Sequence, residues 1–226
     1  MTLKEKDFIE IEFTGKIKDG EVFDSNIKKD LMKLNPNAKT EPFVFSIGQS
    51  MFLKGIDDFL IGKNIGKHVI ELTPDKAFGK RDPKLIQMMP VKVFHEQKIN
   101  PVPGYAFNFD GRIGKVLTSS GGRVIVDFNN PLAGKEIVYN INILRKIEDI
   151  NEKIKSINEF LFRQDLKFEI KDKKLILEVE KSMVRVVEMF KDKYKEILEL
   201  DLEAKGIDKK EEGTKEKEKT SKSQKF

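Results

Sequence analysis

The sequence contains no cysteine and no tryptophan, and histidine occurs only at His68 and His95. Disulfide bonds, thiol catalysis and cysteine-ligated metal sites are therefore excluded, and two distant histidines do not make a histidine-rich metal site. No stretch approaches the roughly 18 apolar residues of a membrane helix, and the first residues lack the apolar run of a signal peptide. We therefore expect a cytoplasmic protein that needs no metal or other cofactor.

The sequence also lacks a large excess of one charge, because 43 basic residues face 38 acidic residues, for a formal net charge of +5. A dedicated nucleic-acid-binding protein usually has a larger excess of basic over acidic residues. Hydrophobic residues make up 38% of the chain, which is enough for packed cores. The abundance of lysine, glutamate and isoleucine is typical of thermophilic proteins.

Alternating apolar and polar residues in the first part of the chain predict antiparallel strands. Residues 7–14 alternate in this way, and the turn signal Asp19-Gly20 predicts that they form a hairpin with the residues that follow. A polar loop with one helical turn is expected at 26–40. Further strands at 43–47 and 67–73 and a short helix at 53–60 complete this predicted region.

Residues 84–129 have the pattern of a separate unit. A helical turn is expected after Pro90, because proline is favoured at helix starts. Three strands at 105–109, 112–117 and 123–128 follow, separated by glycine-containing turns, and they predict a small β-meander. A longer apolar strand at 137–144 then resumes the first region.

The sequence changes character near Glu148. An amphipathic helix at 150–161, a hairpin at 166–179 and a second amphipathic helix at 183–197 predict an α-β-β-α module. The second helix has the spacing of a coiled-coil seam, so a homodimer through this module and a core packed within one chain are both open. From residue 205 the chain is almost entirely polar, which predicts a disordered, solvated tail; nucleic-acid contact is the alternative.

No nucleophile–base pair, phosphate-binding loop or metal cluster stands out; the informative feature is aromatic residues beside tight turns. The segments, in order, are Phe13-Thr14-Gly15, Asp19-Gly20-Glu21-Val22-Phe23-Asp24-Ser25, Pro42-Phe43-Val44-Phe45-Ser46-Ile47-Gly48, Leu72-Thr73-Pro74-Asp75-Lys76-Ala77-Phe78-Gly79 and Asn130-Pro131-Leu132-Ala133-Gly134. Over about Asp7–Ile147, this order resembles the FKBP-type peptidyl-prolyl cis/trans isomerases, in the SlyD-like branch that includes long archaeal members.

The resemblance implies an α+β fold, in which a twisted antiparallel sheet wraps one short helix and an inserted domain replaces the flap loop. The expected domains are residues 1–84 plus 130–147 for the isomerase, 85–129 for the insert, 148–204 for the C-terminal module and 205–226 for the tail. It also implies accelerated folding of proteins that contain X–Pro bonds, an FK506-like macrolide as a ligand, and no membrane or nucleic-acid partner.

By the same resemblance, ten residues line the proline pocket: Phe13, Phe23, Asp24, Phe43, Phe52, Leu53, Ile56, Phe78, Leu132 and Tyr139. The family usually has tyrosine where Phe13 and Phe78 stand, and many members have tryptophan where Ile56 stands. The histidine-rich tail of some SlyD proteins is missing, so nickel handling is not implied. The alternative is that these phenylalanines are ordinary core residues.

The insert carries more apolar residues than a unit of its size can bury, so an exposed binding patch is expected. The candidate residues are Met88, Met89, Val91, Phe94, Tyr105 and Phe107. SlyD-like inserts hold unfolded chains, and the alternative is that these residues only form the insert's own core. A holdase that binds without catalysis, and a factor that binds RNA through its lysine-rich tail, are the competing functions.

Overall fold

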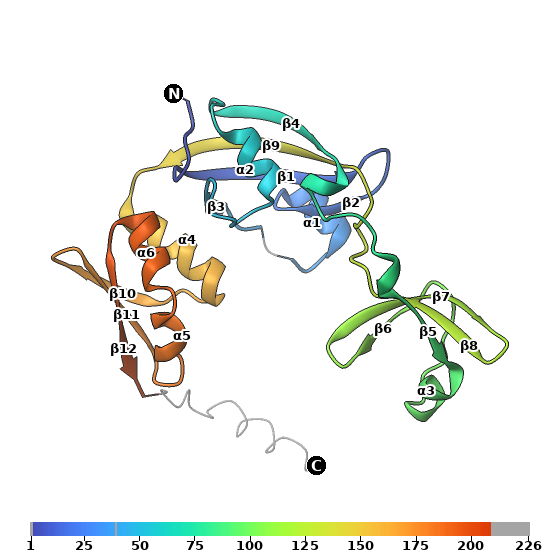
Figure 1. Cartoon of the computed structure of the whole chain (residues 1–226). Coiled ribbons are helices and arrows are strands. Elements are labelled where there is room, and N and C mark those ends of the chain that lie inside the picture. Colours follow the sequence, from blue (N-terminus) through green and yellow to red (C-terminus); the bar gives the residue numbers. More distant parts are fainter. Residues whose placement is uncertain (1, 39, 209–226) are drawn as a thin grey trace, which may run out of the picture. The chain divides into compact units, whose positions relative to one another are not determined.

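The computed structural model describes residues 2–38 and 40–208. The chain divides into two compact units, Met1–Ile147 with two sheets and Glu148–Phe226 with one, and each unit also has helices (Figure 1). Among the described residues, no helix combines the length and the apolar character needed to cross a membrane.

The main sheet of the first unit is built on two long antiparallel strands, β1 (Phe8–Ile17) and β9 (Ile137–Ile147). On its other side β1 pairs with β2 (Val22–Ser25) and with β3 (Phe43–Ser46). On its far side β9 pairs with β4 (Gly66–Leu72), giving the order β2-β1-β9-β4 with β3 beside β1. All strand pairs are antiparallel, as the alternating sequence pattern predicted.

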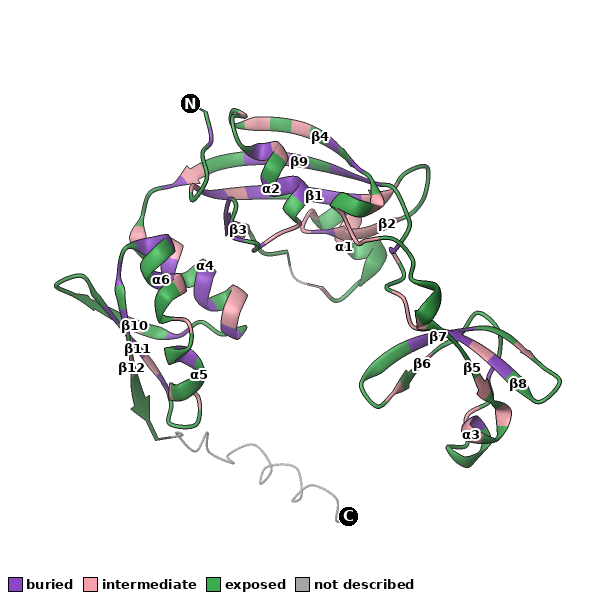
Figure 2. Cartoon of the chain, viewed as in Figure 1, coloured by how far each residue is buried: buried purple, intermediate pink, exposed green. Residues whose placement is uncertain are grey.

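Three short helical segments and α2 connect these strands. Helix α1 (Lys28–Leu34) lies next to β2. Where the sequence predicted one helical turn, the structure has a helix of about two turns, and none of its residues is buried. The predicted short helix is α2 (Lys54–Leu60), which buries Ile56 and Leu60 in the core. Two 3₁₀ turns, η1 (Pro74–Lys76) and η2 (Pro83–Leu85), lead into the insert. Figure 2 shows the buried residues along β1 and β9 that form the core of this sheet.

The insert is a four-stranded antiparallel sheet, not a three-stranded meander. Its strands are β5 (Ile86–Pro90), β6 (Ala106–Phe109), β7 (Arg112–Ser120) and β8 (Arg123–Asp127), in the order β5-β8-β7-β6. The missed strand is β5, whose two methionines and terminal proline carry little strand signal. The helix expected after Pro90 is α3 (Val91–Glu96), and its Phe94 anchors the insert's own hydrophobic core.

The second unit corrects the predicted α-β-β-α order. Helix α4 (Ile150–Phe162) and the hairpin of β10 (Lys167–Lys171) and β11 (Lys174–Glu180) are confirmed. The predicted second helix is instead two short helices, α5 (Val184–Glu188) and α6 (Lys191–Leu198). A further strand, β12 (Asp201–Ile207), pairs in parallel with β11.

These differences have simple physical causes. The helix is interrupted at Met189-Phe190, and Val187, Tyr194 and Ile197 are buried in the core of the second unit. The prediction that these residues form the seam of one continuous coiled-coil helix is therefore wrong. Strand β12 is an edge strand whose charged residues point outward, so its alternation was not recognised; its residues 201–204 lie in the predicted module and 205–207 in the predicted tail. The ordered module therefore reaches Ile207, and the rest of the predicted tail, 209–226, lies outside the described residues.

Candidate active site

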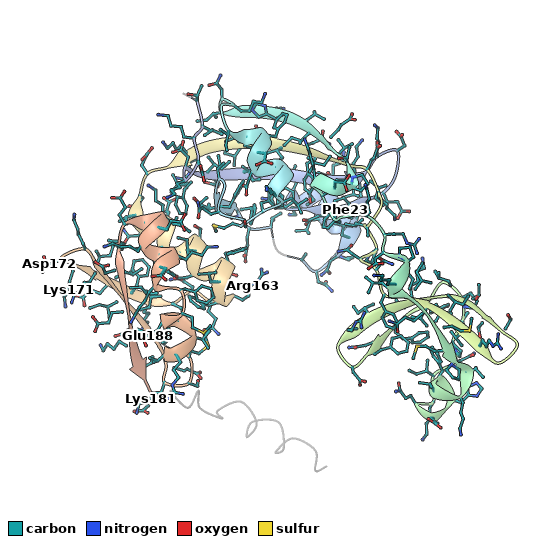
Figure 3. All side chains as sticks on the ribbon, in the orientation of Figure 1. Phe23, Arg163, Lys171, Asp172, Lys181 and Glu188 are labelled. Carbon is teal, nitrogen blue, oxygen red and sulfur yellow. The ribbon has the colours of Figure 1, made fainter. Side chains whose placement is uncertain are left out.

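Aromatic rings from separate segments of the first unit form one continuous cluster. The ring centroids of Phe13 and Phe52 lie 5.2 Å apart, and those of Phe52 and Tyr139 lie 5.4 Å apart. Tyr139 contacts Phe23 at 5.7 Å, and Phe23 contacts Phe78 at the same distance. Tilted and edge-to-face contacts of this kind are the favoured geometry for aromatic pairs. The chain of contacts thus joins β1, β9 and β2 (Figure 3, with Phe23 labelled) to the loops before α2 and after η1.

Phe43 and Phe45 extend the cluster along β3. Their rings stack 5.4 Å apart, and both also contact Phe52. Phe45 was not among the predicted site residues, although its position two residues after Phe43 places it on the same face of the strand. The cluster is layered: Phe13, Phe45 and Tyr139 are buried, whereas Phe23, Phe43, Phe52 and Phe78 are only partly buried and face outward from that base.

Gly15 allows two of these rings to meet over the sheet. In β1 this residue lies opposite Asp24 of β2 on one side and Tyr139 of β9 on the other. A Cβ atom at Gly15 would lie 2.8 Å from Cε1 of Tyr139 and 3.0 Å from Cζ of Phe23. Only glycine therefore leaves room for the edge-to-face contact of the two rings.

Asp24 is the carboxylate of this region and is partly buried beside the rings. Burial raises the pKa of its carboxyl above the ordinary value, while a hydrogen bond from the backbone N–H of Ser25 opposes the shift. Burial, and secondarily the nearby Asp24 charge, also raise the pKa of the Tyr139 hydroxyl, which therefore stays protonated at neutral pH. The site thus combines an apolar ring surface with the Asp24 carboxylate and the neutral phenol of Tyr139.

Small polar residues that follow Asp24 hold β2 against β1. The Ser25 hydroxyl donates to the carbonyl oxygen of Phe13 at 2.9 Å and lies 3.0 Å from the Thr14 hydroxyl. The Thr14 hydroxyl in turn donates to Asp30 of α1 at 3.1 Å. Ser25 and Thr14 are both buried, so these bonds fix the backbone on either side of the candidate site.

Asn26 fills the gap between β2 and β3 along the edge of β1. Its side-chain oxygen accepts from the backbone N–H of Phe13 at 2.7 Å, and its side-chain nitrogen donates to the Ile11 carbonyl at 2.9 Å. The amide therefore imitates a paired strand at the point where β1 changes partners. Ser25 and Asn26 were not predicted as positioning residues, and the signal for them in the sequence is a short polar run directly after Asp24.

The three predicted aliphatic residues lie around the cluster and not within its ring contacts. Leu53 precedes α2 and is partly buried, while Ile56 in α2 is fully buried. Leu132 is partly buried in the turn after the insert. The backbone N–H of Gly134 donates to the carbonyl of Gly79 at 2.8 Å, which ties this turn to the segment that carries Phe78.

The predicted insert residues separate into two groups. Phe94 is 1% exposed and lies in the insert's core, with Met89, Val91 and Phe107 packed against it. Met88 and Tyr105 are 61% and 64% exposed. Phe94 therefore cannot contact a substrate without opening the insert, whereas Met88 and Tyr105 can.

Comparisons with known proteins agree with this architecture. The sequence model of FKBP-type peptidyl-prolyl cis-trans isomerases matches residues 1–95, and the model described as "FKBP26, IF domain" matches residues 87–132. A short-type peptidyl-prolyl cis-trans isomerase of Methanocaldococcus jannaschii is 29% identical over 146 residues, which is 62% of this chain and 92% of the relative.

Two bacterial relatives cover the same share of the chain. The FKBP-type 16 kDa isomerase of Escherichia coli is 30% identical over 139 residues, which is 59% of this chain and 87% of the relative. The SlyD isomerase of Aeromonas hydrophila is 28% identical over 138 residues, which is 60% of each chain. The chain therefore belongs to the FKBP-type family of peptidyl-prolyl cis-trans isomerases.

Proposed function

We propose that the aromatic cluster beside Asp24 is the site at which this isomerase rotates X–Pro bonds of unfolded proteins. The observation that carries the proposal is the convergence of rings from distant segments on one layered cluster, with its outer rings partly exposed next to a partly buried carboxylate. We assign the site to Phe13, Phe23, Asp24, Phe43, Phe52, Leu53, Ile56, Phe78, Leu132 and Tyr139.

The residue types suit the chemistry of amide rotation. The planar X–Pro amide is stabilised by conjugation, and the barrier to rotation is about 20 kcal/mol. Rotation breaks the conjugation, so the twisted amide is less dipolar than the planar one, and an apolar surface favours it over the planar state that water solvates better. No proton transfer and no covalent intermediate are needed. Asp24 contributes by orienting polar groups around the rotating carbonyl.

Phe13 and Phe78 carry no hydroxyl, so these two positions cannot donate a hydrogen bond to the substrate. We therefore expect modest turnover of short peptides and assign the larger effect to proteins that are also held by the insert. An FK506-like macrolide is expected to compete for the same rings.

The site assignment is tested by turnover of a proline-containing tetrapeptide. Phe23→Ala and Asp24→Ala should each lower kcat/KM by about tenfold or more, equivalent to about 1.4 kcal/mol of transition-state stabilisation. Phe160→Ala, which removes a partly buried phenylalanine of α4, is the matched control and should leave turnover unchanged. Unchanged turnover in both site variants would reject the assignment.

We further propose that residues 85–129 form a chaperone domain that delivers unfolded chains to the prolyl site. Support comes from the apolar side chains that the insert leaves exposed, among them Met88 and Tyr105. A second binding surface on the same molecule raises the effective concentration of prolines near the site. Residues 1–84 and 130–147 would then form the isomerase domain.

Replacing residues 85–128 by a short loop separates the two roles. Proline-limited refolding of a protein substrate should slow strongly, whereas tetrapeptide turnover should persist. Undiminished refolding catalysis would show that the insert is not the substrate holder. A holdase that does not catalyse would suppress aggregation and leave the proline-limited rate unchanged in the intact chain, and that result would reject the catalytic proposal.

Self-association through the second unit is a separate proposal. Helix α5 and the residue after it leave Val186 and Met189 46% and 81% exposed, an apolar surface that a second copy could cover. Met189→Glu should convert a dimer to a monomer in light scattering. A wild-type chain that is monomeric at high concentration would contradict this proposal.

A further inference from the structure

The strand register of the insert places its side chains on two distinct faces. Val116 lies opposite Val126, and Met89 lies opposite Val124, on the face that packs against Phe94 of α3. Residues of the other parity therefore point away from this core.

The outer face carries an apolar strip across β5 and β8. Met88 lies opposite Ile125, and Ile86 lies two residues before Met88 on the same face. In the pairing of β6 with β7, Phe107 lies opposite Gly114, and Phe107 packs against the core. Ile113 is the neighbour of Gly114 in β7, so its side chain points to the opposite, outer face. Ile113 is 68% and Met88 61% exposed, so this face is not covered by the insert's own helix.

Two cations bracket this strip. Arg123 starts β8 two residues before Ile125, and Lys115 lies opposite Asp127, two residues after Ile125. Steps of two residues along a strand put each charged row about 7 Å from the apolar row. Among the residues that the structure describes, neither Arg123 nor Lys115 has an acidic partner.

The acidic residue on the same face is already engaged. Asp127 forms an ion pair with Arg81 and accepts hydrogen bonds from the backbone and side chain of Asn129. Elsewhere in the insert, Lys92 pairs with Glu96, and Arg112 lies over the ring of Phe128. Arg123 and Lys115 therefore place positive charge without an acidic partner on the outer face, beside its apolar strip.

The composition of the insert points the same way. Residues 85–129 contain five basic and three acidic side chains, so the insert holds a net +2 of the chain's +5. A surface of this sign repels lysine-rich and arginine-rich segments and attracts acidic ones.

We propose that the outer face of the insert selects extended client segments that carry acidic residues two positions before or after their apolar residues, so that both kinds of side chain lie on the same face of the segment. The apolar side chains would cover Met88 and Ile125, and carboxylates about two residues away would approach Arg123 and Lys115. This inference rests on the proposed client-holding function of the insert and adds the class of client to it.

The test uses the full chain and three labelled peptides with the same apolar residues. The positions two residues away from the apolar residues, on the same face of the extended peptide, are glutamate, glutamine or lysine, and affinity is measured by fluorescence anisotropy at low and high salt. The glutamate peptide should bind about tenfold more tightly than the glutamine peptide at low salt, and the lysine peptide should bind weakest. High salt should shrink these differences, because the contacts are exposed.

Charge-reversal variants locate the effect. Arg123→Glu and Lys115→Glu should each remove the preference for the glutamate peptide. Lys98→Glu is the matched control, because it changes the net charge equally but lies after α3 and not in the sheet. An equal effect of Lys98→Glu would show a response to overall charge and would overturn the proposed face.

The remaining outcomes separate this inference from the function on which it rests. Equal affinity for all three peptides overturns the acidic preference and leaves client holding intact. Binding of none of the peptides, together with no suppression of client aggregation, overturns both.

Discussion

The aromatic cluster of the main sheet and the outer face of the insert are both apolar, but they are built in opposite ways. The cluster packs rings edge to face over a buried base, and a glycine sets the distance between two of them. The outer face exposes flexible and branched aliphatic side chains on an otherwise solvated sheet, with unpaired cations beside them. Recognition of one twisted amide requires preorganised geometry, whereas binding of many unfolded chains requires an adaptable surface.

The largest expected effect is that of Gly15→Ala, which should disrupt the aromatic cluster and leave the outer face of the insert intact. Its Cβ would meet the rings of Tyr139 and Phe23 at 2.8 and 3.0 Å, so at least one ring must move. Overpacking of this kind costs about 1–3 kcal/mol, and tetrapeptide turnover should fall by up to about a hundredfold. Suppression of client aggregation should survive, and its loss would mean that the variant had unfolded generally.

A smaller effect is expected for Gly114→Ala, which should distort the sheet of the insert and leave the aromatic cluster intact. A Cβ at Gly114 would lie 2.6 Å from Val126 and 2.7 Å from Phe128, inside the insert's small core. Client affinity should fall by about tenfold because the insert sheet distorts, while tetrapeptide turnover stays the same. If Gly114→Ala lowered tetrapeptide turnover as strongly as Gly15→Ala, the two regions would not be functionally separate.

The smallest expected effect concerns Asp57, which should change the pH dependence of folding stability without changing either of the two surfaces. This residue of α2 is 3% exposed, and burial raises its pKa to about 6 although the backbone N–H groups of Gly48 and Ser50 donate to it. The folded state therefore binds a proton before the unfolded state does, so the free energy of unfolding should rise as pH falls from about 7 to about 4.

The asparagine variant removes this titration. In Asp57→Asn the rise of about 1 kcal/mol or more on acidification should be lost, as measured by urea unfolding at several pH values. Neither tetrapeptide turnover nor client affinity should change at pH 7, because Asp57 belongs to neither surface. An unchanged pH slope in the variant would assign the titration to another group.

The local elements of the first unit were largely predictable because their signals are local. Asp19-Gly20 and Asp110-Gly111 each join strands that the alternating pattern had already indicated. The strands that were missed, β5 and β12, have weak patterns and exist because a neighbouring strand pairs with them. Likewise, the break between α5 and α6 lies within a continuous helical pattern, because packing into a core overrides helix periodicity.

The sequence alone determined the order of the aromatic segments and the family, because these depend on residue types and spacing along the chain. Only the tertiary structure decided which side chains face outward, that Phe94 lies inside the insert while Met88 lies outside, and that Ser25 and Asn26 hold the strand that carries Asp24. Strand register sets these facts, since a shift of one residue moves every side chain to the opposite face.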